Sequence, residues 1–335
     1  MNSSDVKENS VTRTRSDLHS PRVGREGSAV LSLPEMGRLS HFKEIVNAVG
    51  ELVKIKITFF VGMSALFGFV LASGEISFKM VVSSFGIFLV ACGSAVLNHY
   101  QERESDALMH RTQRRPLPSG TIAPHAALLL LIGLVIVGAA VTFAWGNLAA
   151  LVLSLLAMIW YNAIYTPLKK MTAYAVIPGS FVGSLPVMAG WAAAGGSLMD
   201  PKLLVMSSFF FVWQIPHFWL LMDIYSSDYE RAGFPTMRSH LSEKKFAVST
   251  YAWMLALVAI SVLFITTGVV EGKVTGILLL VLGAWLSMGA WPVVKHFGDK
   301  RTYKSAFMKI NIYVLAVTVL VLVDILFKLI SPRRL

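Results

Sequence analysis

The sequence predicts an all-α protein, a polytopic membrane bundle of nine transmembrane helices. Hydrophobic residues make up 55% of the 335 residues and charged residues only 15%, whereas a soluble globular protein has about 45–50% apolar and about 25% charged residues. The apolar residues gather in nine stretches, each near the ~20 residues that a membrane-spanning helix needs. The connections between the stretches alternate in basic charge. A soluble enzyme, a coiled coil and a disulfide scaffold are therefore unsuitable interpretations.

Residues 1–40 differ from the rest of the chain. Ser, Arg, Glu, Gly and Pro dominate there without a sustained apolar period, which predicts a disordered tail. No apolar core follows the early arginines, so the segment is not a secretory signal. Asp5, Glu8, Asp17 and Glu26 are unusual for a mitochondrial transit peptide. Residues 41–335 are expected to form one transmembrane domain.

The expected spans differ little in length. Several are rich in Gly and Ala, as helices that pack closely in lipid need to be. Pro178, Pro186 and Pro216 fall within spans, where each can open the local backbone. The nine spans are 57–73, 78–97, 124–144, 147–165, 174–194, 202–222, 247–268, 273–294 and 307–330.

The basic residues predict an orientation. The segment before the first span and the connections after spans 2, 4, 6 and 8 carry 23 of the 30 Lys and Arg residues. Basic residues favour the cytoplasmic side, so the amino terminus and the long connections are expected in the cytoplasm. The basic carboxyl tail is an exception to this pattern. Because topology accounts for the net charge of +11, no nucleic-acid partner is expected.

The connection after span 2 begins with a polar stripe. Asn98, Glu102 and Asp106 are four residues apart, so on a helix they form one slanted row about 12 Å long. Oxygen ligands of this kind suit Mg²⁺, which substrate phosphates usually complete. A solvated surface loop is the alternative. However, Asn98 directly follows the apolar run, where polar groups are costly.

Three arginines follow the stripe, at Arg111, Arg114 and Arg115. A guanidinium group binds phosphate oxygens in a bidentate fashion. We therefore expect these residues to clamp a phosphate group that the acidic stripe holds through a metal ion.

A second polar cluster follows span 6, on the same predicted side of the membrane. Asp223 and Glu230 are seven residues apart and would share a helix face if the helix continued that far. His217 lies inside the span, with Gln214 one turn away, and is either an interhelical hydrogen-bond partner or a ligand-binding residue. Two acidic helix ends facing each other could hold a diphosphate through Mg²⁺, with the isoprenoid tail in an apolar pocket.

At these residues the chain resembles the UbiA superfamily of intramembrane prenyltransferases, and within it the heme O branch. The first superfamily motif, Asn-x-x-x-Asp-x-x-x-Asp, is matched by Asn98, Glu102 and Asp106. Further similar blocks are 109–120, 165–172, 183–191, 214–219 and 228–235. The resemblance covers roughly residues 45–330 and leaves the tail out.

The resemblance implies transfer of a farnesyl group from farnesyl diphosphate to a vinyl group of heme b, giving heme O and diphosphate for terminal oxidases. It implies Mg²⁺ as cofactor and a UbiA-like fold for the domain at 41–335. The implied metal and catalytic residues are Asn98, Glu102, Asp106 and Asp228. The implied diphosphate ligands are Arg111, Arg114, Arg115, Lys169 and Lys170. The expected acceptor-binding residues are Gln214, His217 and Tyr225.

The chain departs from this pattern in two places. Ser227 stands where the branch often has an acid before the residue matched by Asp228, which leaves open whether one or two metal ions bind. Lys54-Ile-Lys56 replaces the common Lys-Pro-Arg. In addition, no Cys-x-x-Cys-His motif occurs, so heme is expected as a substrate, and Cys92 is assigned to packing.

Two other functions stay open on the residues alone. One is prenyl transfer to an aromatic quinone precursor, since nothing in the acidic loops selects an acceptor. The other is a transporter, because intramembrane polar residues beside prolines also mark substrate paths. The expected location is the bacterial inner membrane, with the mitochondrial inner membrane as the alternative. Contacts with heme A synthase or oxidase assembly proteins are a further expectation.

Overall fold

A computed structural model of the chain describes residues 33–330, with side chains from Lys43 onward. It divides into two units, one ending at Lys43 and one beginning at Glu44. The first helix, α1 (Leu33–Leu52), begins in the first unit. Most of the expected tail, residues 1–40, lies outside the described residues, and its last eight residues belong to α1. All features below belong to the second unit.

The structure confirms the all-helical fold and the span count. Over residues 33–330 every regular element is a helix, and nine segments are long and apolar enough to cross a membrane. Three of the nine spans consist of several shorter helices. The spans are α2 (Ile55–Ser73), α3 (Phe78–Leu108), α4 (Pro124–Trp145), α5 with η1 and α6 (Leu148–Met171), η2 with α7 and α8 (Ala173–Ala193), α9 (Pro201–Ile224), α11 (Glu243–Thr266), α12 with α13 (Lys273–Lys295) and α14 (Lys300–Ile330).

Outward-facing side chains on these helices are largely apolar. Phe78, Leu129 and Met288 are each more than two-thirds exposed. In water such a surface would drive aggregation, whereas lipid tails solvate it without cost. The chain is therefore a multi-pass membrane protein.

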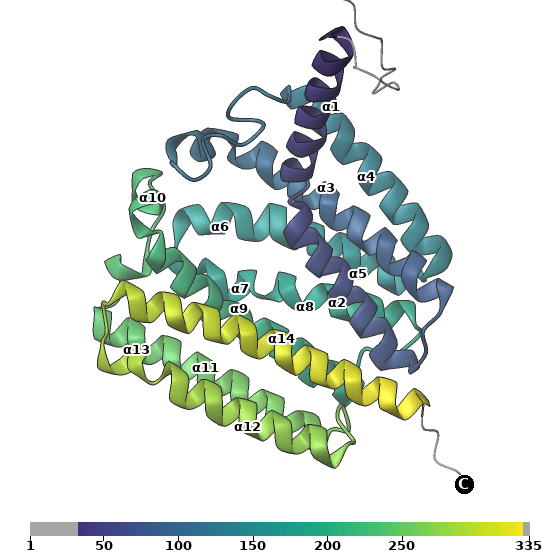
Figure 1. The fold of residues 1–335 in the computed structure, drawn as a ribbon, viewed down its shortest axis with the longest axis vertical. Coiled ribbons are helices and arrows are strands. Elements are labelled where there is room, and N and C mark those ends of the chain that lie inside the picture. The colour runs from purple at the N-terminus through teal and green to yellow at the C-terminus, as the bar shows by residue number, and fades with distance from the viewer. Residues whose placement is uncertain (1–32, 331–335) are drawn as a thin grey trace, which may run out of the picture. The chain divides into compact units, whose positions relative to one another are not determined.

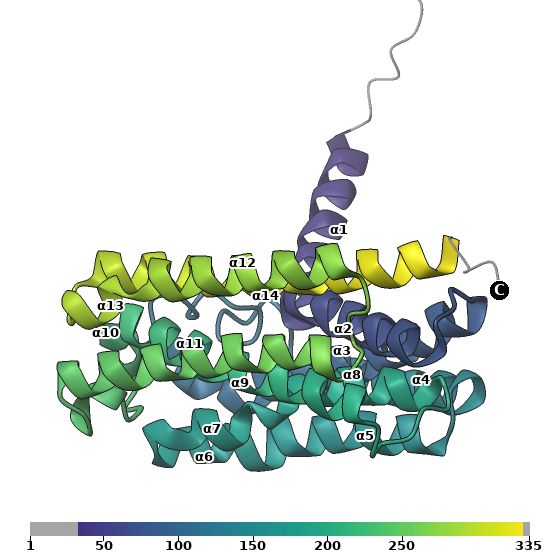
Figure 2. The same ribbon diagram turned by 90° about the horizontal axis from the view of Figure 1, so that it is seen from below.

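Helices α8 and α9 contact helices from both halves of the chain. Helix α8 contacts α2, α5 and α9, and α9 also contacts α11 and α14. In Figure 1, α2 to α5 lie beside one another, and α11, α12 and α14 form a neighbouring group next to α9. Figure 2 shows α12 and α14 on the opposite side of α9 from α6 and α7. Helix α9 therefore lies at the centre, between the two groups of helices.

Glycines allow α2 and α8 to approach closely. A Cβ atom at Gly68 would collide with the carbonyl oxygen of Val187, and one at Gly190 would collide with the carbonyl oxygen of Ala65. Small residues of this kind let helix backbones touch in lipid, where no hydrophobic effect drives the helices together. The contact fixes α8 against α2 and so brings the next span, α9, near the amino-terminal helices.

Two helix bounds matter for the site. Helix α3 continues without a break to Leu108, eleven residues beyond the expected end of its span, so the whole polar stripe is helical. Helix α9, in contrast, ends at Ile224, and a separate short helix, α10 (Ser226–Arg231), follows. The two polar clusters are therefore built differently, one on a continuous helix and one across a helix joint.

Candidate active site

The polar stripe faces the protein interior. Asn98, Glu102 and Asp106 lie on successive turns of α3 and are 0%, 6% and 2% exposed. Burial of two carboxylates and an amide costs several kcal/mol unless each finds a partner. The row therefore needs compensating groups, and the structure supplies three cations.

Each member of the stripe contacts its own basic residue. The Lys54 ammonium donates to Oδ1 of Asn98 at 2.5 Å, Lys169 pairs with Glu102, and Arg115 donates to Oδ2 of Asp106 at 2.7 Å. These cations come from the α1–α2 turn, from α6 (Thr166–Met171) and from the loop after α3. The stripe is thus a buried row of polar side chains, each of which contacts one basic residue.

Lys54 is a site residue that sequence analysis did not assign. It adopts a left-handed backbone conformation, with φ 51° and ψ 48°, between α1 and α2. Such a conformation costs a residue with a side chain about 1–3 kcal/mol, and residues that adopt it cluster at functional sites. Burial lowers the pKa of Lys54 to about 7. The turn aims the ammonium at Asn98 and at the Tyr161 hydroxyl, 3.3 Å away.

The fourth span contains a π-helical turn, η1 (Trp160–Tyr165). The backbone N–H of Thr166 donates to the carbonyl of Tyr161, five residues earlier. The wider turn brings Tyr161 and Tyr165 into a stacked pair, with ring centroids 5.9 Å apart. Single π turns inside α-helices are frequent at functional sites. The apolar pattern of this span held no signal for the turn.

Hydrogen bonds hold the π-helical span against α3. Nδ2 of Asn98 donates to the Thr166 hydroxyl at 3.0 Å. Nδ2 of buried Asn162 donates to Ser94 at 2.7 Å, and Gln101 donates to the Asn162 carbonyl at 3.1 Å. Because these polar groups form hydrogen bonds with one another, the Asn98 end of the stripe is held rigidly.

The three arginines after the stripe occupy different environments. Arg115 pairs with Asp106, whereas Arg111 and Arg114 are exposed. The Arg111 guanidinium lies over the ring of Tyr225, 5.6 Å from its centroid. Arg111 therefore touches the second cluster, and Tyr225, expected near the acceptor, lies exposed at the end of α9.

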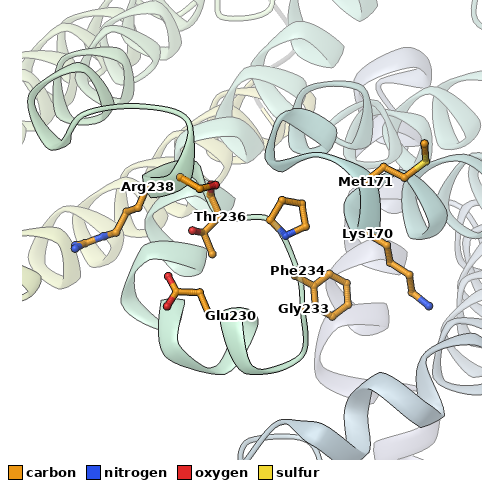
Figure 3. Close-up of a pocket in the computed structure, with 9 residues that line it drawn as sticks. Lys170, Met171, Glu230, Gly233, Phe234, Thr236 and Arg238 are labelled. Atoms are coloured by element: carbon orange, nitrogen blue, oxygen red, sulfur yellow. The ribbon is translucent and has the colours of Figure 1, made fainter.

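Lys169 and Lys170 point in different directions. Lys169 pairs with Glu102 and lies 5.6 Å from the Tyr165 ring centroid and 5.8 Å from that of Phe234. Lys170 is exposed and lines an open cavity of about 650 Å³. Figure 3 shows Lys170 on the wall opposite Glu230 and Arg238. Only Lys169 is thus brought to the stripe.

The second cluster does not act as one acidic face. Asp223 is buried and accepts two hydrogen bonds from Arg238, at 2.5 and 3.1 Å, and the bond raises the pKa of the Arg238 guanidinium. Because α9 ends at Ile224, Glu230 lies on a separate short helix and is exposed. The conditional expectation that the two acids share a face is therefore not met.

Asp228 lies on α10 and is largely buried, with a side chain 15% exposed and 3.9 Å from Arg231. Contacts of Arg111 with Tyr225 and of Lys169 with Phe234 bring the segment around Asp228 beside the first cluster. Among the side chains described, no three His, Cys, Asp or Glu groups lie together as a ready metal site. A metal ion shared between Asp228 and the stripe stays a prediction.

The expected acceptor residues Gln214 and His217 lie one turn apart on α9. Gln214 fits against α8 where Gly183 has no side chain, since a Cβ there would overlap its amide. Nδ1 of His217 lies 2.8 Å from Oδ1 of Asn311 on α14. Sequence analysis did not assign Asn311, because nothing along α14 marks it as a partner of α9.

Comparison with known proteins places this geometry in a family. Residues 61–313 match the UbiA prenyltransferase family. The chain is 36% identical over 198 residues to a protoheme IX farnesyltransferase of Geobacter sulfurreducens, covering 59% of this chain and 73% of that one. It is 32% identical over 248 residues to one of Nitratidesulfovibrio vulgaris (strain DP4), covering 74% and 86% of the two chains.

Solved structures share the fold at low identity. A digeranylgeranylglyceryl phosphate synthase superposes with a TM-score of 0.68 at 18% identity, covering 84% of this chain and 98% of that one. A UbiA homolog from Archaeoglobus fulgidus bound to DMAPP and Mg²⁺ has a TM-score of 0.62 at 16% identity, covering 83% and 98%. At this identity the likeness shows the arrangement of helices.

Proposed function

We propose a specific reaction for this chain, which belongs to the UbiA prenyltransferase family. The reaction is transfer of the farnesyl group of farnesyl diphosphate to a vinyl group of heme b, which gives heme O and diphosphate. The similarity to relatives named protoheme IX farnesyltransferase supports the acceptor. The buried row of Asn98, Glu102 and Asp106 with its three cations supports the diphosphate side, and it is the observation that carries the proposal.

The donor chemistry of the row fits Mg²⁺. The row buries two carboxylates and an amide oxygen inside the helix bundle. Mg²⁺ prefers oxygen ligands of this kind together with substrate phosphates. We propose that Asn98, Glu102 and Asp106 hold the ion, with Asp228 as a further ligand from α10. When bound, the ion neutralises charge that develops on the diphosphate.

The cations of the row stabilise the leaving group. Breaking the bond between C1 of the farnesyl group and the diphosphate oxygen leaves both electrons on the diphosphate. Fixed positive charges near that oxygen lower the barrier, because they need no reorganisation when the charge appears. Lys169 pairs with Glu102, and Arg115 pairs with Asp106. Arg111 contacts the ring of Tyr225 in the second cluster. We assign these three residues to the diphosphate and place Lys170 on the outer cavity instead.

The acceptor completes the reaction. The vinyl group of heme b supplies the electron pair for the new carbon–carbon bond, and water adds hydroxide to the other vinyl carbon while releasing one proton. The stacked rings of Tyr161 and Tyr165 border the stripe and limit water there, which protects the allylic cation from early hydrolysis. Gln214, which packs against α8, and His217, which contacts α14, are assigned to the heme.

One assay tests this function. Purified protein in detergent receives heme b, farnesyl diphosphate and Mg²⁺, and the hemes are separated by chromatography. We expect a farnesylated heme that disappears when divalent metal is chelated. Unchanged heme beside a prenylated aromatic quinone precursor, supplied in a parallel reaction, would instead support the quinone alternative. Activity that survives exhaustive chelation would contradict the metal assignment.

We further propose that the protein resides in the bacterial inner membrane with its amino terminus in the cytoplasm. The basic connections after spans 2, 4, 6 and 8 support this orientation, and it places both polar clusters on the cytoplasmic side. The nine spans found among residues 33–330 then put the end of α14 on the opposite side. A carboxyl-terminal reporter that reads cytoplasmic would contradict the orientation. Contacts with heme A synthase or oxidase assembly proteins stay a prediction.

A further inference from the structure

His217 is joined to the last transmembrane helix by a defined hydrogen bond. Its Nδ1 atom lies 2.8 Å from Oδ1 of Asn311. The amide nitrogen of Asn311 donates to the carbonyl oxygen of Phe307, one turn earlier on α14, at 2.7 Å. The two contacts use the two ends of one side-chain amide.

These contacts fix the protonation pattern of the imidazole. Because the Asn311 nitrogen must face the Phe307 carbonyl, the amide oxygen faces His217. An amide oxygen only accepts hydrogen bonds, so Nδ1 of His217 must carry a proton and donate it. In the neutral ring, Nε2 then holds a free lone pair.

The surroundings of His217 are aromatic. The ring centroids of Phe307, Trp213 and Phe218 lie 4.8, 5.2 and 5.2 Å from that of His217. Nε2 makes no hydrogen bond to residues 43–330, and this atom is not completely buried. A second proton on Nε2 would create a charge among apolar rings, which burial disfavours. The lone pair is therefore available to a ligand.

The imidazole lies next to the proposed diphosphate site. The Phe218 ring contacts the His217 ring and also the Tyr165 ring. The ring centroids of Phe218 and Tyr165 are 6.4 Å apart. Tyr165 in turn contacts Lys169, which pairs with Glu102. A flat apolar acceptor held at His217 would thus adjoin the site where the farnesyl donor is activated.

We infer that Asn311 is a positioning residue that holds His217 with its Nε2 lone pair ready to bind the iron of the heme acceptor. The inference rests on the proposed function. A propionate carboxylate would need a donor hydrogen, and the only one on this neutral ring already goes to Asn311. Metal-ligating histidines commonly donate their other ring N–H to such a partner, which sets the tautomer and ring orientation.

Heme binding followed by spectroscopy tests the inference. Heme b is titrated into purified wild-type protein and the variants His217→Ala, Asn311→Ala, Asn311→Asp and Thr318→Ala. We expect His217→Ala to lose the histidine-ligated spectrum and Asn311→Ala to bind heme about 10–100-fold more weakly, as is usual when the partner of a ligating histidine is removed. Thr318 is the matched control, because it lies two turns along α14 and bonds only within its own helix, at 2.8 Å.

Asn311→Asp separates positioning from support of the fold. Its carboxylate still accepts the hydrogen bond from the Nδ1–H group and makes the imidazole a stronger electron donor. The iron–histidine stretching frequency in resonance Raman spectra of reduced heme should therefore rise above the wild-type value, while affinity stays within about threefold. An unchanged frequency would overturn the inference, even if Asn311→Ala failed to fold.

The outcomes distinguish the inference from the function it rests on. Wild-type protein that farnesylates heme b while Asn311→Ala keeps the wild-type affinity and spectrum overturns the role of Asn311 alone. A His217→Ala variant with an unchanged heme spectrum also overturns it. Wild-type protein that neither binds nor farnesylates heme b refutes the proposed function itself.

Discussion

Two adjacent lysines provide a direct test of the active-site assignment. Lys169 pairs with buried Glu102, and its own side chain is 22% exposed. Lys170, the next residue, points to the outer cavity and is exposed. Replacing either lysine by methionine removes one positive charge from the same segment while keeping a similar length of apolar chain. A difference between the variants therefore reports position rather than net charge.

The expected magnitudes follow from the two environments. Loss of one fixed group that stabilises charge in a transition state typically lowers kcat by about 10²–10³, or about 2.7–4 kcal/mol. We expect this loss for Lys169→Met and less than about a threefold change for Lys170→Met. Removing one partner of a buried pair also costs about 3–5 kcal/mol of stability. The partial exposure of Lys169 places it at the low end of that range.

The double variant Lys169→Met with Glu102→Gln separates stability from catalysis. It removes the unpaired buried carboxylate, so the thermal unfolding temperature in detergent should recover toward the wild-type value while turnover stays low. The assay is single-turnover formation of farnesylated heme, measured together with unfolding of the same samples. Equal turnover in Lys169→Met and Lys170→Met would refute the reasoning, since the two positions would then be equivalent.

Three further predictions concern other parts of the molecule. Asp106→Asn should abolish turnover while the protein elutes from size exclusion like the wild type; normal turnover would remove Asp106 from the metal ligands. Gly190→Val should prevent α2 and α8 from packing and reduce the yield of folded protein, because its Cβ meets the backbone of Ala65, whereas Gly133→Ala, with open space around its Cβ, should not. Hydrogen bonds from Thr302 and the backbone lower the pKa of Asp299, so its stabilising effect is present above the unfolded pKa near 3.8 and is lost as pH falls through the lower folded value. Asp299→Asn should therefore unfold at a lower temperature than the wild type at pH 7, and this difference should shrink as the pH falls below 3.8; a constant difference would contradict the cause.

The sequence predicted the bundle because its main determinant is local. Apolar stretches of membrane-spanning length and alternating basic connections report directly on the solvent around each segment, and all nine spans are found. The row of Asn98, Glu102 and Asp106 was predictable for a similar reason. A spacing of four residues puts side chains on one face wherever the helix continues, and α3 does continue.

The partners of the row could not be predicted, since they come from distant segments. Lys54 reaches Asn98 through a left-handed turn, and Asn311 meets His217 from a helix ninety-four residues away. Neither contact produces a periodic pattern in the amino-acid sequence. The difference between Lys169 and Lys170 was hidden in the same way, because direction depends on the turn that precedes them.

That preceding turn, the π turn at Trp160–Tyr165, sets the direction of the residues that follow it. A π turn holds one residue more than the α turn it replaces, and one residue corresponds to about 100° of rotation around the axis. Deleting Ile164 would tighten Trp160–Tyr165 into ordinary helix and swing everything after it by that angle. Lys169 would turn away from Glu102 without any change in its own identity. The register of this span, as much as its composition, therefore determines whether Lys169 can reach Glu102.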